Sequence, residues 1–330
     1  MFNTSIYQHL RRSCQNIAIP LLGCILLHCD LSIAQTQQYP NKPIRLLVGF
    51  SAGGSADSSA RTIATLMGDA LKTRIVIENR GGAGGSIAAQ IVSRAPADGY
   101  TLLWSSPGAL TISQILEKNL SYKTETAFAP IGLALTYCNA LVSRTDFQFN
   151  SIAQLIAYAK DNPGQIKYAT QGVSSAGHLS GEMLQVMSGL KLTHIPYKGG
   201  NEIMTALLGN ELQLGFVSST TAGVMRSRIR ILAVTSLHRD PSLPDVPSLH
   251  ESGVSNYDAN FWFGLLAPAG TPPAIIQRLN SLMRETLSNP EVTRVVKAQG
   301  LNPAPSTAQE YTALIRADYL KWKKVISPAN

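Results

Sequence analysis

Short apolar runs alternate with amphipathic segments along the chain from Lys42 onward. The run IRLLVGF is continuously apolar, as in a strand buried on both faces, and the apolar residues after it recur at helical spacing. Strands that alternate with helices in this way are typical of a parallel sheet with helices on both faces. The first block predicts a strand at 44–50, a helix from Ala60 to Leu71, a strand at 74–79, a short helix ending at Val92 and a strand at 101–106.

A second alternating block begins after Ser143, and Ser151 stands where a helix N-cap is expected. The tail of the chain starts with the apolar run NFWFGLLAPAGTP and continues only as helices. The last helix is expected to begin at a capping box formed by Ser306 and Gln309. The second block predicts strands at 166–172, 192–197, 212–218 and 230–236.

Two blocks and a helical tail predict an α/β protein of two lobes, each a sheet flanked by helices. The first lobe is expected to comprise residues 35–136 and 264–330, so that the tail packs on it, and the second lobe residues 137–263. The chain would then cross between the lobes twice, near Tyr137 and near Phe263.

Residues 1–34 have the features of an export signal rather than of a folded domain. Arg11 and Arg12 form a basic start, the apolar run at 17–27 is too short to span a bilayer, and small residues precede Gln35. We therefore expect a mature chain in the periplasm. Two other interpretations stay open, because LLGC is similar to a lipoprotein box and the arginine pair is similar to a twin-arginine signal.

Cysteine usage excludes an intramolecular disulfide in the mature chain, because Cys14, Cys24 and Cys29 lie in the signal and leave only Cys138. The same count excludes a metal cluster of cysteine and histidine ligands, and we expect neither a metal nor a cofactor. Roughly 300 residues remain after the signal, which is enough for two ordinary domains to bury their own cores.

The chain carries 28 lysines and arginines against 20 acidic residues, and removing Arg11, Arg12 and Asp30 leaves 26 against 19, a net charge near +7. Such an excess suits an anionic ligand, although it is also ordinary for a soluble surface. Nucleic acid is not expected as a partner, because an exported protein rarely meets it and the basic residues are dispersed outside residues 321–324.

The loop after the first strand has two interpretations. Residues 49–53, GFSAG, match the G-x-S-x-G elbow of serine hydrolases, in which Ser51 would be the nucleophile. Four histidines follow it as candidate bases, but the elbow of a hydrolase follows several strands, whereas this loop follows the first one. The context therefore favours a loop that does not react, and we do not expect an enzyme.

In the second interpretation the same loop binds a ligand through its backbone. Gly53 and Gly54 are expected to adopt positive φ and to bring N–H groups to an anion at the start of the following helix. Asp57 would cap that helix or accept a hydrogen bond from the ligand. A tight strand-to-helix connection that binds nothing would explain the glycines as well.

Similar small polar loops follow two other predicted strands, at residues 105–108 and 172–177. Ligands of open parallel sheets bind at the carboxyl ends of strands, so these loops would face each other across a cleft. The run GGAGG at 81–85 lacks the G-x-G-x-x-G spacing of a dinucleotide site. His178 is either a pH-sensitive ligand contact or a structural residue early in a helix.

Seven stretches, spread over almost the whole mature chain, carry a family resemblance. They are YPNKPIRLLVGFSAGGSADSSAR, VIENRGGAGGSIAA, PADGYTLLWSSPG, YATQGVSSAGHLSGE, HIPYKGG, LAVTSLHRDPSLPDVPSLHESG and FWFGLLAPAGTP. In this set and order the chain resembles the substrate-binding receptors of tripartite tricarboxylate transporters, the Bug family.

The resemblance implies a type II periplasmic binding protein of the Venus-flytrap kind, in which two lobes joined by two hinge strands close on a small carboxylate-bearing solute. Such receptors deliver the solute to membrane permease subunits and perform no chemistry, and we expect a monomer. The ligand-binding residues that the resemblance implies in the first lobe are Phe50, Ser51, Ala52, Gly53, Gly54, Ser55, Asp57, Ser105 and Ser106. Those of the second lobe are Gly172, Ser174, Ser175, His178, Tyr197 and Ser218.

Ala52 departs from the family pattern, which usually has proline there, and the loop is expected to be less rigid for that reason. The sequence leaves the solute open among di- and tricarboxylates, acidic amino acids, aromatic acids and nicotinate-like compounds. It also leaves open whether the bound solute is transported or sensed.

Overall fold

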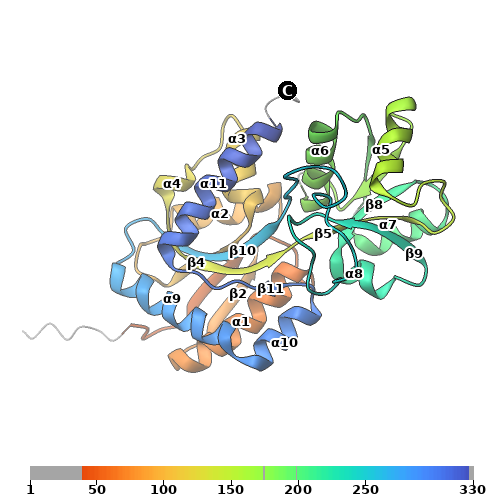
Figure 1. Ribbon diagram of the computed structural model, residues 1–330. Helices are drawn as coiled ribbons and strands as arrows, with labels where there is room; N and C mark the ends of the chain where they lie inside the picture. Colours follow the sequence, from red (N-terminus) through yellow and green to blue (C-terminus); the bar gives the residue numbers. More distant parts are fainter. Residues whose placement is uncertain (1–38, 174, 198, 327–330) are drawn as a thin grey trace, which may run out of the picture. The chain divides into compact units, whose positions relative to one another are not determined.

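The computed structural model describes residues 39–173, 175–197 and 199–326. The predicted export signal with its two alternatives, and the predicted ligand residue Ser174, lie outside the described residues. Residues 39–326 build two β-sheets flanked by helices (Figure 1), which confirms the predicted α/β class with two sheets. Within the described ranges no helix combines the length and the apolar character needed to cross a bilayer.

The first sheet has six strands in the order β11-β4-β10-β3-β1-β2. They are β1 (Ile44–Val48), β2 (Ile75–Asn79), β3 (Thr101–Ser105), β4 (Phe128–Tyr137), β10 (Phe261–Pro268) and β11 (Asn302–Pro303). β1 is parallel to β2 and β3, whereas β10 is antiparallel to both β3 and β4. Within this sheet the predicted parallel pairing holds for β1 to β3, whereas β10, which returns from the second sheet, is antiparallel to both of its neighbours.

The second sheet has five strands in the order β7-β6-β8-β5-β9. They are β5 (Asn139–Arg144), β6 (Lys167–Thr170), β7 (Thr193–Pro196), β8 (Leu214–Ser218) and β9 (Ile229–Val234). β6 is parallel to β7 and β8, and β5 is antiparallel to β8 and β9. The sequence pattern predicted β6 to β9 but not β4 and β5, because the long apolar run that contains both has no clear period.

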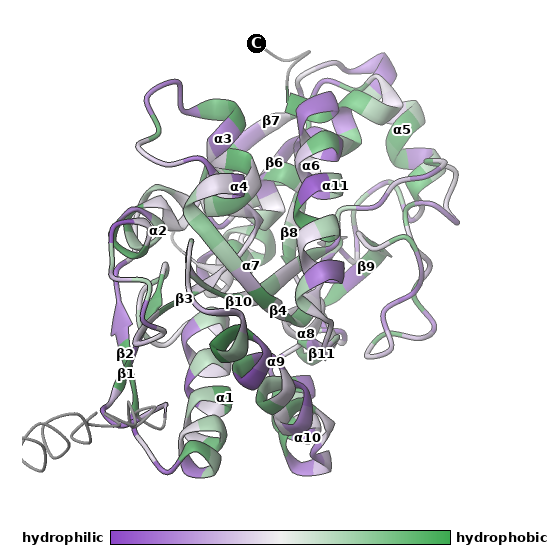
Figure 2. Ribbon diagram, turned by 90° about the vertical axis from the view of Figure 1, so that its left-hand side faces the viewer, coloured by the Kyte–Doolittle hydropathy of each residue, from purple (hydrophilic) through white to green (hydrophobic). Residues whose placement is uncertain are grey.

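Helices cover both faces of the first sheet (Figure 1). One face carries α1 (Ser55–Leu71), α9 (Pro273–Ser288) and α10 (Pro290–Ala298). The other side carries η1 (Ala83–Gly85), α2 (Ser86–Ser93), η2 (Gly108–Ile112), α3 (Ser113–Leu116), α4 (Thr124–Ala127) and α11 (Ala308–Ile326). The apolar residues that predicted α1 are all buried, and Figure 2 shows the central strands β4 and β10 mostly in hydrophobic colours.

The second sheet is covered in the same way. α5 (Ile152–Asp161) and α6 (Ala176–Ser188) pack on one face, and α7 (Gly200–Leu208) and α8 (Ser219–Val224) on the other. Leu141 of β5 joins the core under α5 and α6, while its neighbours Ala140 and Val142 join the opposite core, as the alternation of a strand requires. Ser151 caps α5 as predicted, because its side chain accepts a hydrogen bond from the Gln154 N–H.

The two connections between the sheets are tied together. β4 and β5 are separated by Cys138 alone, and the connection from β9 to β10 contains the buried Asp240. The Asp240 carboxylate accepts hydrogen bonds from Cys138 Sγ and Ser219 Oγ, both at 3.1 Å. Burial raises the pKa of the Cys138 thiol to about 12, so the thiol stays protonated and acts as a donor. The first residue of α8 is thereby held beside both connections.

The start of α11 differs from the prediction by one residue. The capping box pairs Thr307 with Glu310, since the Thr307 N–H donates to Glu310 Oε2 at 2.8 Å and the Glu310 N–H donates to Thr307 Oγ1 at 3.2 Å. Ser306 has other partners, since its hydroxyl oxygen accepts the backbone N–H of Leu133 at 3.1 Å and its hydroxyl donates to the carbonyl oxygen of Thr307 at 2.9 Å.

The sequence led us to expect that the tail packs on the first sheet. Its last helix, α11, packs against cores of both sheets. Tyr311 and Ile315 of α11 belong to a core of the first sheet. Trp322 and Val325, near the other end of the helix, belong to the core under α5 and α6. α11 is therefore a third link between the two sheets.

Candidate ligand-binding site

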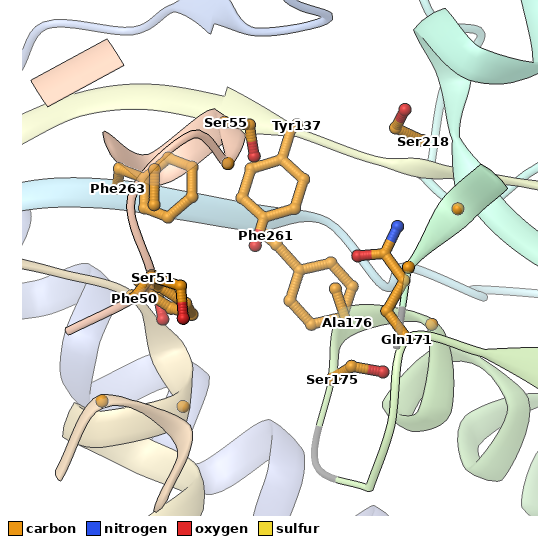
Figure 3. Close-up of a pocket in the computed structure, with 18 of the residues that line it drawn as sticks. Phe50, Ser51, Ser55, Tyr137, Gln171, Ser175, Ala176, Ser218, Phe261 and Phe263 are labelled. Atoms are coloured by element: carbon orange, nitrogen blue, oxygen red, sulfur yellow. The ribbon is translucent and has the colours of Figure 1, made fainter. Parts of the chain in front are cut away.

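A cavity of about 910 Å³ opens between loops of the first sheet and loops of the second (Figure 3). On one side it is lined by the loops that follow β1, β2 and β3, and on the other by the loops that follow β6, β7 and β8. Each of these strands is parallel to a neighbour and presents its carboxyl end to the cavity, which is where open α/β sheets bind ligands.

Glycines allow the three loops of the first sheet to pack on one another. A Cβ atom at Gly49 would lie 2.8 Å from Gly85 Cα, and one at Gly108 would lie 2.5 Å from the carbonyl oxygen of Gly84. Both contacts would be with backbone, which cannot move aside easily. The glycine-rich run at 81–85 is thus explained by close backbone approach, in agreement with its lack of a dinucleotide fingerprint.

The N-terminus of α1 directs its backbone donors at the cavity. Gly54 is the N-cap of this 17-residue helix and has no side chain that could accept a hydrogen bond from the first turn. The N–H groups of a first turn have no partner within the helix, and they carry the positive end of the helix dipole. Gly54, Ser55 and Ala56 all line the cavity, so this helix end suits an anionic group.

Asp57 lies behind the loop rather than on the cavity. Its Oδ2 accepts hydrogen bonds from the Gly53 N–H at 2.9 Å and from Arg61 Nε at 3.0 Å, and its Oδ1 accepts from Asn79 Nδ2 at 2.9 Å. Burial alone would raise the pKa of Asp57, but these donors and the charge of Arg61 hold it below its usual value. The carboxylate therefore stays ionised and fixes the loop, and it does not accept a hydrogen bond from a ligand in this arrangement.

Only one of the two expected left-handed glycines is left-handed. Gly53 has a φ of 88°, and Gly54 has a φ of −81°. The prediction for Gly54 was wrong because an N-cap residue takes extended backbone, which any residue can adopt. Gly53 alone needs glycine for its backbone conformation.

Two capped helices begin at the cavity on the side of the second sheet. The Ser175 hydroxyl oxygen accepts the His178 N–H at 3.2 Å at the start of α6, and the Ser218 hydroxyl oxygen accepts the Thr221 N–H at 3.2 Å at the start of α8. Both hydroxyl groups line the cavity together with the exposed amide of Gln171, as Figure 3 shows.

His178 and His194 form a polar cluster behind the loop that follows β6. Their ring centroids lie 4.3 Å apart, and His194 Nε2 lies 2.6 Å from Thr170 Oγ1. The Thr170 hydroxyl donates its proton to the carbonyl oxygen of Gly172 at 3.2 Å, so His194 Nε2 must be the donor to Thr170. Burial and the adjacent His178 lower the pKa of His194 to about 4. The cluster thereby holds the loop in place through neutral imidazole.

Aromatic rings form a column between the two groups of loops. Neighbouring rings in the column are stacked, with centroid distances of 6.1, 5.0, 5.7 and 5.6 Å along Trp104, Phe263, Tyr137, Phe261 and Trp322. The three central rings line the cavity. The sequence analysis placed the two crossings between lobes near Tyr137 and Phe263. Because a ligand between two lobes lies beside their connections, this position indicated that these rings could border the ligand.

The predicted ligand residues divide into two groups. Those that line the cavity are Phe50, Ser51, Ala52, Gly53, Gly54, Ser55, Ser106, Ser175 and Ser218. Those that the structure places outside the lining are Asp57, Ser105, Gly172, His178 and Tyr197. Polar side chains on the cavity that the sequence did not single out are Tyr137, Asn139, Gln171, Glu202, Thr221 and Gln299.

Ser51 has no catalytic base within the described part of the chain. No hydrogen bond joins its hydroxyl to a histidine there, and no histidine is among the described residues that line the cavity. His194, on the side of the second sheet, bonds Thr170 instead. The elbow interpretation therefore lacks the side chain that would activate the serine.

A family model described as "Tripartite tricarboxylate transporter family receptor" matches residues 59–330. The chain belongs to this family. Protein BugT of Bordetella pertussis is 33% identical to it over 291 residues, which are 87% of this chain and 89% of BugT. The predicted resemblance to Bug receptors is thereby confirmed.

Solved structures of two relatives have the same fold. The periplasmic binding protein BugD is 35% identical, with a TM-score of 0.75 over 88% of this chain and 98% of BugD. Rpa4515 of R. palustris, solved with adipate, is 31% identical, with a TM-score of 0.78 over 88% of this chain and 97% of that one. BugD is described as a periplasmic binding protein, and Rpa4515 was solved with a bound small molecule, adipate.

Proposed function

We propose that this protein is a periplasmic receptor that holds a small carboxylate-bearing solute between its two sheets and delivers it to the permease of a tripartite tricarboxylate transporter. The observation that carries the proposal is the free N-terminus of α1 at the cavity, in a chain of this family. The adipate in the structure of Rpa4515 supports a carboxylate, and the family description supports a transporter as the partner.

Binding needs donors rather than reactive groups. The N–H groups of residues 54–56 take the carboxylate, and the Ser175 and Ser218 hydroxyls with Gln171 reach the solute from the second sheet. A solute held from both sides stabilises the closed arrangement, in which the two groups of loops are close together. The size of this stabilisation is the difference between the solute's binding free energies for the closed and the more open arrangement. The receptor acts as a monomer and leaves its solute chemically unchanged.

A substitution at Ser55 separates anion binding from folding. Ser55→Asp places a carboxylate in the first turn of α1, where it favours the helix but repels a bound anion. Ser55→Asn is the matched control, because it has nearly the same shape and no charge. We expect Ser55→Asp to weaken binding at least tenfold, which corresponds to a loss of about 1.4 kcal/mol or more, and Ser55→Asn to change it much less.

The measurement starts from the full chain, expressed and recovered from the periplasmic fraction, with mass spectrometry of any small molecule released on denaturation. Calorimetry with the released solute, and with adipate as a probe, then compares the wild type with the two variants, and small-angle scattering measures compaction. If no carboxylate binds, or if Ser55→Asp binds as tightly as Ser55→Asn, the proposed function is wrong.

A further inference from the structure

Asn139 is a buried polar residue at the point where the chain passes from the first sheet to the second. It is the first residue of β5, it is 6% exposed, and it lines the cavity. Its side chain lies on the face of the second sheet that α5 and α6 cover, because it is two positions before Leu141, which belongs to the core on that face. A polar side chain buried beside a cavity normally has a partner for each of its polar atoms.

A neighbouring hydrogen bond determines which end of the Asn139 amide faces α6. The Ser180 hydroxyl donates its proton to the carbonyl oxygen of Ala176 at 2.8 Å. Towards Asn139 the Ser180 oxygen can therefore only accept, and Asn139 Nδ2 lies 3.5 Å from it. The reverse orientation of the amide would set two oxygen atoms against each other with no proton between them. Asn139 Oδ1 consequently faces away from Ser180.

Asn139 Oδ1 is an acceptor without a donor in the part of the chain that the structure describes. The backbone of Asn139 is paired with Thr235, whose Oγ1 accepts the Asn139 N–H at 2.9 Å and whose N–H donates to the Asn139 carbonyl oxygen at 2.9 Å. No described donor bonds Oδ1, and it is not one of the unpaired side-chain atoms there that are enclosed by protein. Oδ1 is thus open to the cavity, and an amide oxygen accepts but cannot donate.

The hydroxyl groups of Ser218 and Thr221 lie on the same side of the cavity. Ser218 is the partner of Asn139 across β5 and β8, so their side chains lie on one face of the sheet, with Cβ atoms about 5 Å apart. One of the two hydroxyl groups donates to the other, since Ser218 Oγ and Thr221 Oγ1 are 2.8 Å apart. The second hydroxyl proton has no acceptor among the described residues, and both residues line the cavity.

This corner therefore offers one atom that only accepts and one proton to donate. A hydroxyl group matches both, because it donates and accepts at once. An ammonium group can donate to Asn139 Oδ1 but cannot accept the remaining proton, and a carboxylate oxygen would be repelled by Oδ1. Figure 3 shows Ser218 across the cavity from Ser51, so the corner is separate from the loop that faces the carboxylate.

From these contacts we infer that Asn139 is a specificity-determining residue, which selects a solute that carries a hydroxyl group in addition to its carboxylate. This inference rests on the proposed function and adds a contact from the connection between the sheets. The solute hydroxyl donates to Asn139 Oδ1 and accepts the proton that Ser218 and Thr221 leave over, while the carboxylate lies at the N-terminus of α1.

The size of the selection follows from the cost of an unpaired acceptor. A solute without a donor at this position covers Asn139 Oδ1 and leaves it without a hydrogen bond. Leaving one buried acceptor unpaired corresponds to a loss in affinity of roughly ten- to hundredfold. A methyl group in place of the hydroxyl has nearly the same size, so it isolates this effect from the effect of shape.

The test is calorimetry with four probes on the wild-type protein, recovered from the periplasmic fraction of cells that express the full chain. Malate carries the hydroxyl, methylsuccinate has a methyl group in its place, succinate has hydrogen there, and aspartate has an ammonium group. Both enantiomers of each chiral probe are measured, and the tighter ones are compared. We expect malate to bind at least about tenfold more tightly than methylsuccinate or succinate, and more tightly than aspartate.

Variants assign the preference to Asn139. Asn139→Leu keeps the approximate volume and removes the acceptor, so the ratio of the affinities for malate and methylsuccinate should fall to about twofold or less. Asn139→Asp keeps an acceptor oxygen, so it should retain a preference for malate over methylsuccinate although its charge weakens both. Gln114→Leu is the control, because the Gln114 amide donates to the carbonyl oxygen of Tyr122 at 3.2 Å and does not line the cavity. It should keep the wild-type ratio.

The outcomes distinguish this inference from the proposed function. If malate and methylsuccinate bind equally, if aspartate binds more tightly than malate, or if adipate binds and malate does not, selection of a hydroxyl is wrong while the receptor function stands. If Asn139→Leu keeps the wild-type ratio, Asn139 does not select the solute and the inference is overturned. If neither these probes, nor adipate, nor any released carboxylate binds, both the inference and the proposed function are wrong.

Discussion

The backbone N–H of Gly53 donates a hydrogen bond to Asp57 Oδ2 at 2.9 Å, so the loop at the cavity is anchored to the helix that it precedes. Asp57 is buried and binds Arg61 and Asn79 as well. The Asn79 amide also donates to the carbonyl oxygen of Phe50 at 3.0 Å, which secures the other end of the loop. One carboxylate thus positions the backbone that faces the solute without touching the solute itself.

Replacing Asp57 by Asn should weaken both folding and binding. The variant loses the negative charge that accepts hydrogen bonds from Gly53, Arg61 and Asn79, so the free energy of unfolding should fall by about 1–3 kcal/mol. Ligand binding should weaken several-fold, because the loop is no longer anchored to the helix. Urea denaturation and calorimetry measure the two effects. Glu78→Gln is the control, because Glu78 also pairs with arginines, Arg45 and Arg80, but does so near the surface. Equal effects of the two substitutions would contradict the anchoring role.

Valine at Gly53 should be harmful and valine at Gly54 mild. A β-branched residue at a φ of 88° is strained by roughly 1–2 kcal/mol, whereas Gly54 is extended and a Cβ there meets nothing closer than 3.8 Å, the Ser51 carbonyl oxygen. Thermal unfolding of the two variants measures the difference directly. A larger loss of stability in Gly54→Val than in Gly53→Val would refute the backbone assignment.

The local pattern of the chain predicted most of the fold because each parallel strand carries its own signal. β1 is a continuous apolar run, and the buried residues of α1 recur at helical spacing. β4 and β5 were not predicted. They belong to different sheets, and the point where the chain passes from one sheet to the other, at Cys138, has no local sequence signal. β11 has two residues, and a strand that short depends on its pairing with β4 rather than on its own sequence.

The sequence predicted the parts of the candidate site that are formed by loop backbone, but not the parts that depend on how side chains pack. The loops after β1 and β6 can be recognised by small residues at the ends of apolar runs. Tyr137 and Phe261 are ordinary core residues by sequence, and only the stacking of rings from β4 and β10 places them at the cavity. Asp57 was expected to cap the helix or to contact the ligand, whereas it binds behind the loop, and its partner Asn79 comes from the next strand and could not be deduced from spacing.

Acid should destabilise the protein through His194. Burial and His178 lower the pKa of His194 to about 4, below its ordinary value near 6.5. The unfolded chain therefore binds the proton more readily, so this contribution to stability is complete above about pH 6.5 and is lost as the pH falls toward 4. Glu182, whose Oε1 lies 3.9 Å from His178 Nε2, opposes this shift only in part.

His194→Gln should make the melting temperature less dependent on pH between 6.5 and 4. Glutamine keeps an N–H that can reach Thr170 but does not titrate. His238→Gln, in the loop after β9, is the control and should keep the wild-type dependence. If the melting temperature of the wild type and of His194→Gln changes equally with pH over this interval, the buried imidazole does not cause the pH dependence of stability.

The loop after α10 meets α8 so closely that only glycine fits. Gly300 has a φ of 79°, and a Cβ atom there would lie 1.8 Å from Thr220 Oγ1 and 2.9 Å from Thr220 Cβ. The loop belongs to the side of the first sheet and α8 to the second, and Gly300 also lines the cavity. The contact therefore limits how closely the two sides can approach around a solute.

Alanine at Gly300 should hold the two sides apart. We expect Gly300→Ala to weaken solute binding by roughly tenfold, or about 1.4 kcal/mol, and to enlarge the radius of gyration of the solute-bound protein in small-angle scattering. Gly253→Ala is the control for backbone strain, because Gly253 has a φ of 104° and an added Cβ atom there would meet nothing within 4 Å. Thr220→Ala removes a buried oxygen that has no hydrogen bond among the described residues, so alone it should cost little, and combined with Gly300→Ala it should restore part of the affinity. If Gly300→Ala binds the solute as Gly253→Ala does, or if Thr220→Ala restores nothing, the contact does not govern the approach of the two sides.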